Sequence, residues 1–558
     1  MTKKLKTEKR NKKEEITKLP DKTKVNDGIK FTVMAVILIA VFCIALTPVT
    51  LQNDTFYTIK IGEHIVQSGI DMQDPYPHWL YDLITYLIYN AAGMTGIYVV
   101  TCLLSVTLGL TLYATNRKLV KNQLFSFLIT IGVMYLIRGY IAARAQLVTF
   151  ILFVLTIYFI EKFLETKKKR YAVGLIIIPT LIANLHVAVF PFYFVLYLPY
   201  IAEYIIAILA ETIIYRKIEL KIIKAKIKIL SKKTGNETRI QRLKEQLKTL
   251  EEIVDKTKIK RTKALQNPYK IKLEKKDATK WLILIMIICV FTGFLTPLGN
   301  TPYTYLEKTM EGNTTQNINE HLPMTLATDT EVMCVLIIFL AIMIFTKTKI
   351  RLCDLFMVGG LGYLMIMSRR QVTMFMLICS FILNRFLVEL TSTYTKQTMN
   401  GLIKKVTKIP VMIIITAIML GFSYHEGKDK LDDTYIDETA YPVQACDYII
   451  ENIDLGTAKF YNEYNYGSYM LYRGIPVFID SRADLYAPEF SGKEEDIFMD
   501  FIDTSSIGTF YEDTFEKYGI THVITYKNSK MNMIITKTQD ENLKEIYSDK
   551  YFVVYERT

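Results

Sequence analysis

Long apolar runs separated by short polar connections make up most of this chain between residues 31 and 424. The runs are rich in Phe, Leu, Ile and Met, and stretches of about 18 or more such residues match the hydrocarbon core of a bilayer, which is about 30 Å thick. The pattern therefore predicts a polytopic α-helical membrane protein with about eleven spans. The predicted spans lie near residues 31–50, 94–114, 122–137, 147–164, 171–185, 190–212, 280–297, 331–346, 354–367, 371–390 and 409–424.

The pattern changes after residue 424, where shorter helical and strand-like segments alternate. An α/β domain with a mixed or mostly parallel sheet is predicted from this alternation. Its predicted helices are 442–453, 466–473 and 511–518, and its predicted strands are 458–462, 476–480, 521–526 and 551–556.

Two polar or amphipathic segments interrupt the spans. Residues 79–90 form an amphipathic helix that we expect to lie in the membrane interface. The basic segment 216–280 has helical propensity, Glu-to-Lys pairs and a break at SKKTGNE, which predicts a basic helical hairpin. It is either a solvated linker or a regulatory docking site.

These patterns divide the chain into five parts. They are a basic cytoplasmic tail (1–30), an N-terminal transmembrane module with a first outer loop (31–212, loop 51–93), a basic cytoplasmic helical segment (213–280), a C-terminal transmembrane module with a long outer loop (281–424, loop 298–329) and an extracytoplasmic α/β domain (425–558).

The distribution of charge predicts the orientation. Lys and Arg gather on alternate connections, such as the head KKLKTEKRNKK, NRKLVK and KTKIR, and the positive-inside rule assigns these to the cytoplasm. The first apolar run is long enough to remain as an anchor. With an odd number of spans, we expect a multi-pass protein of the cell membrane with a cytoplasmic N-terminus and an extracytoplasmic C-terminal domain.

The charge balance of the two regions supports the same orientation. Residues 425–558 hold 26 Asp and Glu against 13 Lys and Arg, a net charge of −13, which leaves +26 on the rest of a chain whose total is +13. The basic character therefore indicates membrane topology and contact with anionic lipid, and not nucleic acid. The seven cysteines show no disulfide framework and no Cys/His metal spacing.

Candidate catalytic carboxylates follow the first span, in LQNDTFYTIKIGEHIVQSGIDMQDPYPHWLYD. Asp54, Asp71 and Asp74 lie there beside a membrane face. A carboxylate at a lipid boundary costs free energy, so such residues usually have a function.

Arginines on outer connections depart from the positive-inside rule. Arg138 and Arg144 flank one outer turn, and Arg369 and Arg370 occupy another. A guanidinium matches phosphate oxygens in two parallel hydrogen bonds, which favours a phosphate site. The alternatives are snorkelling to lipid headgroups and structural pairing with Asp54, Asp71 or Glu320. His186, at the end of the fifth span, is either a ligand or a satisfied helix-end residue.

Two outer elements add further candidates. The loop 298–329 is too long for a simple turn, which is typical of a functional loop or lid, and Glu320 and His321 are its candidate polar contacts. In the outer domain, YNEYNYGSYMLYRGIPVFIDSRADLY gathers Tyr, Asn and Arg around a predicted strand that ends at Asp480, near Arg482. Such a surface suits a sugar, although Tyr-rich cores are equally common.

The location of the charges favours one class of chemistry. A transporter would hold ionisable residues near mid-membrane, whereas these spans are predicted to be free of them and the charges gather at the outer ends. With no nucleotide-binding motif, the natural donor is a sugar on a polyprenyl phosphate. The competing interpretation is a membrane transporter or a non-enzymatic envelope scaffold with an outer binding domain.

The same residues resemble a known family. The order of NDTFYTIKIG, GEHIVQSG, DMQDPYP and HWLYDLITYLIY is similar to the GT-C class of multi-span, lipid-phosphosugar-dependent glycosyltransferases. RAQLVTF, NLHVAVF, INEHLP and the outer Tyr-rich segment extend the likeness to bacterial members related to protein O-mannosyltransferases and oligosaccharyltransferases.

This resemblance implies roles for particular residues. The catalytic acid of the class falls on Asp54, with Asp74 as the second candidate, and Arg138, Arg144 and Arg370 would neutralise the departing lipid phosphate. The second outer loop, RGYIAARAQ, lacks the acidic pair of metal-dependent members. A divalent cofactor, Mg²⁺ or Mn²⁺, is therefore left open, as are the sugar, the acceptor and any protein partner.

Overall fold

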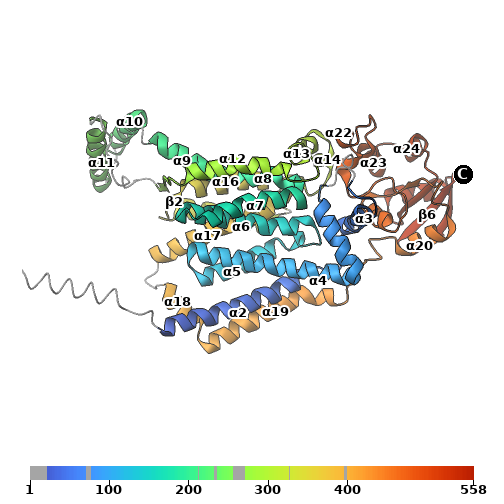
Figure 1. The fold of residues 1–558 in the computed structure, drawn as a ribbon, viewed down its shortest axis with the longest axis horizontal. Helices are drawn as coiled ribbons and strands as arrows, with labels where there is room; N and C mark the ends of the chain where they lie inside the picture. Colours follow the sequence, from blue (N-terminus) through green and yellow to red (C-terminus); the bar gives the residue numbers. More distant parts are fainter. Residues whose placement is uncertain are drawn as a thin grey trace, which may run out of the picture.

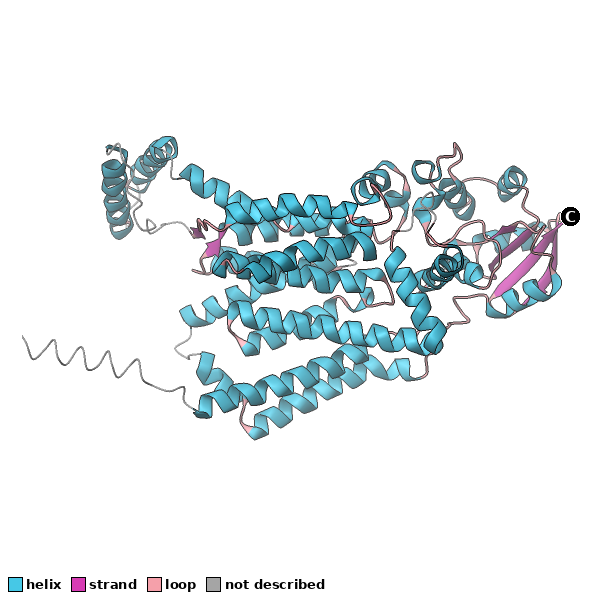
Figure 2. Cartoon of the chain, in the orientation of Figure 1, coloured by secondary structure: helices cyan, strands magenta, loops and turns pink. Residues whose placement is uncertain are grey.

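The computed structural model describes residues 22–70, 77–210, 213–231, 236–255, 270–325, 327, 329–394 and 399–558. Long helices lie side by side in a bundle, with a small domain containing the sheet at one end and a helical hairpin at the opposite end (Figure 1). The strands of the small domain are grouped at its far side (Figure 2). The molecule is therefore mostly helical, and its acidic and basic regions lie at opposite ends.

Six helical segments within the described residues are long and apolar enough to cross a membrane. They are Gly28–Leu46 in α2 (Lys22–Leu46), α4 (Trp79–Val120), α6 (Ala145–Thr166), Val187–Ala210 (η2, Val187–Val189; α8, Phe190–Val195; α9, Leu198–Ala210), Arg369–Tyr394 (η4, Arg369–Gln371; α17, Val372–Tyr394) and Ile409–Leu431 (α19, Ile409–Gly427; η5, Lys428–Leu431). Other helices of the bundle are α5 (Gln123–Leu136), α7 (Lys169–Leu185), α12 (Thr279–Val290) with η3 (Phe291–Phe294), α15 (Thr330–Phe345), α16 (Leu352–Met367) and the short α18 (Met399–Val406).

The outer surface of the bundle is apolar as well as its core. Phe345 is 84% exposed and Ile409 is 72% exposed, and both lie on helices of the bundle. A helix that is hydrophobic on all sides belongs in a membrane, because exposing its apolar side chains to water would cost free energy. The fold therefore confirms a helical membrane protein. Each predicted span overlaps one of these helices, while the total of about eleven crossings and their orientation stay predictions.

Helix α4 combines two predicted elements. It has 42 residues, or about 63 Å at 1.5 Å per residue, which is twice the thickness of a hydrocarbon core. Gly93 breaks it with a positive φ of 60°. The part before Gly93 corresponds to the predicted amphipathic helix, and the part after it corresponds to the predicted second span.

Buried charges at the end of the bundle away from the sheet correct one expectation. Arg351 Nη2 lies 2.6 Å from Glu161 Oε1 and 2.7 Å from Asp354 Oδ1, and Arg385 Nη2 lies 2.6 Å from the same Asp354 oxygen. Three of these residues fall within predicted spans, so the prediction that the spans are free of ionisable residues is wrong. Two carboxylates and two guanidiniums cancel in charge, which makes their burial tolerable.

The basic segment forms the predicted helical hairpin. Its helices α10 (Ile213–Leu230) and α11 (Glu237–Asp255) pack through Ile223, Leu243 and Leu250. A short parallel pair, β1 (Ile271–Lys272) with β2 (Ile350–Arg351), lies at the same end of the bundle.

The C-terminal domain has a four-stranded mixed sheet in the order β3-β4-β6-β5. The β3/β4 pair is parallel, and the β4/β6 and β6/β5 pairs are antiparallel. The strands are β3 (Phe460–Tyr461), β4 (His522–Tyr526), β5 (Leu543–Ser548) and β6 (Phe552–Arg557), and the helices are α20 (Val443–Asn452), α21 (Tyr464–Tyr472), η6 (Ala483–Tyr486), α22 (Pro488–Ser491), α23 (Ile497–Ser506), α24 (Tyr511–Tyr518) and α25 (Lys530–Thr538). The predicted mixed α/β domain is present, with β5 as an additional strand.

The predicted strand 476–480 is wrong, because a side chain takes the place of a neighbouring strand. Asn462 Oδ1 accepts from the Phe478 amide at 2.7 Å, and Asn462 Nδ2 donates to the Ile479 carbonyl at 2.7 Å. The Ile479 carbonyl also packs on Gly467, where a Cβ would approach it to 2.0 Å. The extended backbone is thus satisfied without joining the sheet.

Candidate functional site

The connection after α2 places Asp54 at the end of the bundle nearest the C-terminal domain. Asp54 lies in the first turn of α3 (Asn53–Ser68), where the helix dipole favours a negative charge. Helix α3 packs against the first part of α4 at Gly62, and a Cβ there would lie 2.2 Å from the Asp82 carbonyl oxygen. Only glycine permits this approach, which holds the start of α3 in position.

Arg144 joins two carboxylates that are distant in the sequence. Its Nη2 lies 2.9 Å from Asp54 Oδ2, and its Nη1 donates to Glu320 Oε1 at 3.2 Å. Burial opposes the charge of Arg144, but the two carboxylates outweigh this and raise its pKa. Three separate connections therefore meet in one ion cluster, Asp54–Arg144–Glu320. We call it the outer ion cluster because it lies at the end of the bundle nearest the C-terminal domain.

Arg370 lies beside this cluster. Its amide donates to the Glu320 carbonyl at 2.8 Å, and its Nη1 lies 3.3 Å from His321 Nε2. Burial, and then the charge of Arg370, lower the pKa of His321. The backbone contact fixes the long loop 298–329 against the turn before α17.

A half-buried histidine, His78, and a buried one, His186, lie together beside the site. The His78 and His186 rings are 5.2 Å apart, and His186 Nδ1 lies 3.0 Å from the Thr149 hydroxyl. Burial, and then the charges of Arg370 and Arg144, lower the pKa of His78 to about 3. The pKa of His186 is also lowered, first by burial. Both rings are therefore neutral at pH 7 and add no charge to the site.

The C-terminal domain contributes Tyr464 to the site, where it faces the start of α3. Asn53 Nδ2 donates to the Tyr464 carbonyl at 2.9 Å. Burial, and then the negative charge of Asp54, raise the pKa of Tyr464. Tyr464 is thus a neutral phenol close to the outer ion cluster.

Asp480 and Arg482 form a fixed pair at the same boundary. Asp480 is fully buried, and its two oxygens accept from Arg482 Nε and Nη2, the latter at 2.5 Å. The Tyr486 hydroxyl donates to Asp480 at 2.9 Å. This holds the guanidinium of Arg482 5.9 Å from the centre of the Tyr57 ring. Asp480 therefore holds Arg482 close to Tyr57, which lies on α3.

Asp484 connects the long loop 298–329 to the C-terminal domain. It accepts from the Tyr305 hydroxyl at 3.0 Å and from the Thr314 hydroxyl at 2.8 Å. These partners lie on α13 (Thr301–Glu311) and α14 (Thr314–Asn317). The loop that carries Glu320 is therefore packed against the domain.

Several buried polar atoms here have no hydrogen-bond partner among the described residues. They include Asn53 Oδ1, Asp82 Oδ1 and Arg144 Nε, and Asp82 is only 1% exposed. Buried polar groups are nearly always satisfied, so a concentration of exceptions points to water or a ligand. These atoms can therefore form further hydrogen bonds, in which the two oxygens would accept and Arg144 Nε would donate.

The remaining predicted residues lie elsewhere or outside the described residues. Arg138 packs on the Tyr135 ring at 3.9 Å and lies 3.5 Å from Glu331, whereas Arg369 lies 3.3 Å from Asp329. Both arginines thus contact carboxylates other than Asp54 and Glu320, the two partners of Arg144. Asp71 and Asp74 lie outside the described residues.

The donor set of the outer ion cluster does not fit a divalent cation. Arg144 contacts both Asp54 and Glu320, so a guanidinium already lies between the two carboxylates. Within the described ranges there is no group of three or more His, Cys, Asp or Glu side chains that could hold a metal ion.

The fold and the site define a helical membrane protein with a polar, charged site between one end of its bundle and a mixed α/β domain. The chain is similar to the crystal structure of the Archaeoglobus fulgidus oligosaccharyltransferase tethered with an acceptor peptide containing the NVT sequon, with 10% sequence identity, a TM-score of 0.49, and coverage of 94% of this chain and 74% of that chain. A likeness at this level assigns neither fold nor activity. No protein-family model and no curated protein matches the chain.

Several residues of the site had no distinctive signal in the sequence. Tyr57, His78, Asp82, Tyr464 and Asp484 each lie within a quoted segment, but their residue types are common in cores and loops. The spacing of His78 and Asp82, one helical turn apart at the start of α4, was the available signal. Their convergence depends on contacts between distant segments.

Proposed function

We propose that this protein is a membrane glycosyltransferase that moves a sugar from a polyprenyl-phosphate donor to an extracytoplasmic acceptor, namely a cell-envelope glycan, lipid or protein. The observation that carries the proposal is the outer ion cluster with Arg370 beside it. Asp54, Arg144 and Glu320 come from separate connections and meet in this cluster. The folded C-terminal domain lies at one end of the bundle (Figure 1).

Arg370 is the best candidate for binding the donor phosphate. Among the described residues, no carboxylate forms an ion pair with its guanidinium, whose side-chain contact is the 3.3 Å approach to His321. The neighbouring His78 and His186 are kept neutral by burial. Arg370 therefore provides positive charge that the described side chains leave uncompensated, and a planar guanidinium suits phosphate oxygens.

The proposed reaction is a single displacement at the anomeric carbon. The acceptor hydroxyl forms the new bond to that carbon while Asp54 takes its proton, and the bond from the carbon to the phosphate oxygen breaks. The phosphate leaves with the bonding electrons, and Arg370 and Arg144 stabilise the charge that grows on it. Asp74 remains the alternative general base.

The position of the site supports a donor held in lipid. The bundle exposes apolar side chains, and the first part of α4, which was predicted to be amphipathic, begins beside the site. A polyprenyl tail can stay among apolar surfaces while its phosphate reaches the arginines at the helix ends.

The decisive experiment compares Asp54→Asn with Glu331→Gln. Glu331 is an exposed carboxylate whose partner is Arg138, so Glu331→Gln controls for the loss of a negative charge. In a strain lacking the wild-type gene, Asp54→Asn should lower transfer by about 10²- to 10⁴-fold, the usual contribution of general-base catalysis. Surface glycans should fall and lipid-linked sugars accumulate, at unchanged protein levels. Unchanged glycans would reject the assignment and favour the scaffold.

A second pair of variants tests the phosphate role. Arg370→Gln should raise the KM for the lipid-linked donor by at least about tenfold, because a charge-assisted hydrogen bond is lost. Arg138→Gln, at the arginine that packs on Tyr135, should leave the donor KM within about twofold of wild type. Equal effects of the two variants would remove the specific role of Arg370.

A further inference from the structure

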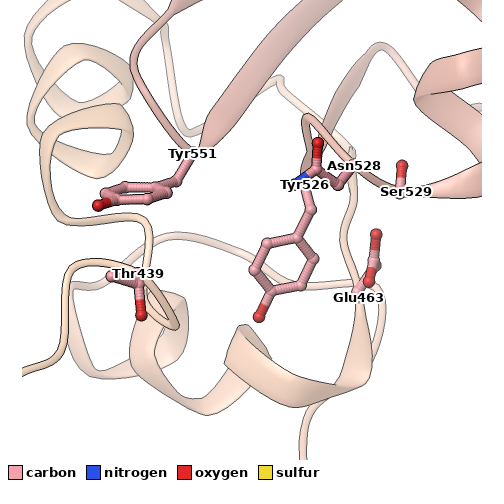
Figure 3. Close-up of a pocket in the computed structure, with 6 residues that line it drawn as sticks. All are labelled: Thr439, Glu463, Tyr526, Asn528, Ser529 and Tyr551. Atoms are coloured by element: carbon pink, nitrogen blue, oxygen red, sulfur yellow. The ribbon is translucent and has the colours of Figure 1, made fainter.

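A hollow lined by polar side chains lies in the C-terminal domain, apart from the outer ion cluster. It has a volume of about 250 Å³. Pockets for drug-sized ligands usually have about 300–1,000 Å³, so this one suits a smaller group. The lining residues are Thr439, Glu463, Tyr526, Asn528, Ser529 and Tyr551 (Figure 3).

The pocket lies beyond the carboxyl ends of two parallel strands. Glu463 follows β3, and Tyr526 ends β4, with Asn528 and Ser529 in the turn after it. The β3/β4 pair is the parallel pair of this sheet. Turns beyond the carboxyl ends of adjacent parallel strands converge, which makes this edge a common place for ligands in α/β folds.

Hydrogen bonds hold the polar groups of the pocket in place. The Thr525 hydroxyl donates to Glu463 Oε1 at 2.7 Å and lies 2.7 Å from the Ser529 hydroxyl. The Tyr526 hydroxyl donates to the Ala440 carbonyl at 3.0 Å. The pocket is therefore preorganised, with the rings of Tyr526 and Tyr551 on two sides of it (Figure 3).

Charge narrows the class of ligand. The Glu463 carboxyl disfavours an anion, and the Lys550 ammonium, 4.9 Å from the centre of the Tyr551 ring, disfavours a cation at that ring. The other lining groups are an amide, hydroxyls and phenols, which exchange hydrogen bonds with neutral hydroxyls. Tyrosine rings also offer apolar faces to the C–H groups of a sugar ring.

The pocket adjoins the outer ion cluster through one stretch of backbone. Glu463 lines the pocket, and the next residue, Tyr464, accepts the hydrogen bond from Asn53 beside Asp54. A chain of linked sugars that occupied the pocket would therefore be held close to the site of transfer.

We propose that this pocket binds one neutral sugar unit of a saccharide acceptor, a role that rests on the proposed glycosyl transfer. Glu463 and Asn528 bind its hydroxyls, and Tyr551 packs against its C–H face. The pocket selects an acceptor that already carries a sugar, and it takes no part in the bond-making step.

The test measures binding to the full-length protein in lipid nanodiscs, without turnover. The probes are the methyl glycosides of glucose, galactose and mannose, N-acetylglucosamine, and tetramethylammonium, observed by saturation-transfer NMR. The variants are Glu463→Gln and Tyr551→Ala, with Tyr547→Ala as the matched control. Tyr547 is a tyrosine of the same domain that packs on Tyr448 and does not line the pocket.

At least one sugar probe should bind. Both pocket variants should lower its affinity by about tenfold or more, as expected for loss of a charged hydrogen-bond partner or a packing face. Tyr547→Ala should retain binding. Absence of sugar binding, binding that the pocket variants do not change, or pocket-dependent binding of tetramethylammonium instead would overturn the proposal. Because Asp54→Asn is assayed for transfer and the pocket variants for binding, failure of the proposed function is distinguishable from failure of the pocket.

Discussion

Arg144 Nη2 lies 2.9 Å from Asp54 Oδ2, and the same guanidinium donates to Glu320 at 3.2 Å. The planar fork of an arginine can contact two carboxylates at once, whereas an ammonium acts as a single point charge. Arg144 thus sets the distance between α3 and the loop 298–329. Its substitution should affect both the geometry of the site and its charge.

We expect Arg144→Lys to keep the charge but lose the bridge. Transfer should fall by at least about tenfold, and the free energy of unfolding in detergent should fall by about 1–2 kcal/mol, since a hydrogen bond to a charged group is lost. Arg144→Gln should be worse in both measurements, because it leaves two carboxylates facing each other. Arg138→Lys is the matched control. Wild-type activity in Arg144→Lys would show that charge alone is sufficient.

Chelation of divalent cations should leave transfer unchanged. Arg144 already contacts both carboxylates of the outer ion cluster, so a metal ion would have to displace it. The measurement is transfer by purified protein in EDTA, followed by titration with Mg²⁺ and Mn²⁺. A loss of activity in EDTA that either ion restores would contradict this prediction.

Gly62→Ala should separate α3 from α4. The added Cβ would lie 2.2 Å from the Asp82 carbonyl oxygen, which belongs to backbone and cannot rotate away. Overpacking of this kind costs about 1–3 kcal/mol and should displace Asp54, so both stability and transfer should fall. Gly132→Ala, on α5 with open space around its Cβ, should instead gain about 0.5–1 kcal/mol from helix propensity. Thermal unfolding in detergent distinguishes the two, and similar behaviour would refute the close approach.

Asp484→Asn should loosen the long outer loop. The Tyr305 and Thr314 hydroxyls donate to different oxygens of this carboxylate, and an amide offers only one acceptor. Limited proteolysis within 298–329 should accelerate by about tenfold, which corresponds to the loss of about 1.4 kcal/mol. Asp513→Asn, at an exposed carboxylate of the same domain, provides the control. An unchanged cleavage rate would indicate that other contacts hold the loop.

Acid should destabilise the folded protein through His78. The pKa of His78 is about 3 in the folded state, below its ordinary value of 6.5. The unfolded chain therefore takes up a proton that the folded protein refuses, and stability falls as pH decreases from about 6.5 toward 3. His78→Gln should flatten this dependence in thermal unfolding between pH 7.5 and pH 5. The control is His425→Gln, at an exposed histidine, and equal slopes in His78→Gln and wild type would contradict the assignment.

Local patterns predicted the helical elements well. The apolar runs, the break before residue 94 and the basic hairpin all have local causes, namely hydropathy, glycine and helix propensity. The strand 476–480 was mispredicted because Asn462, a residue from outside that segment, satisfies its backbone. The buried pairing of Glu161 with Arg351 and Arg385 was also missed, since charges distant in sequence neutralise each other only after folding.

The sequence by itself determined that this is a helical membrane protein with an acidic C-terminal α/β domain, because apolar stretches in lipid must satisfy their own backbone hydrogen bonds and therefore form helices wherever they occur. Only the tertiary structure decided which polar side chains meet. Arg144 contacts a carboxylate 176 residues away, and Tyr464 reaches the first connection from the other end of the chain. Such contacts depend on how whole helices pack, and no local pattern contains that information.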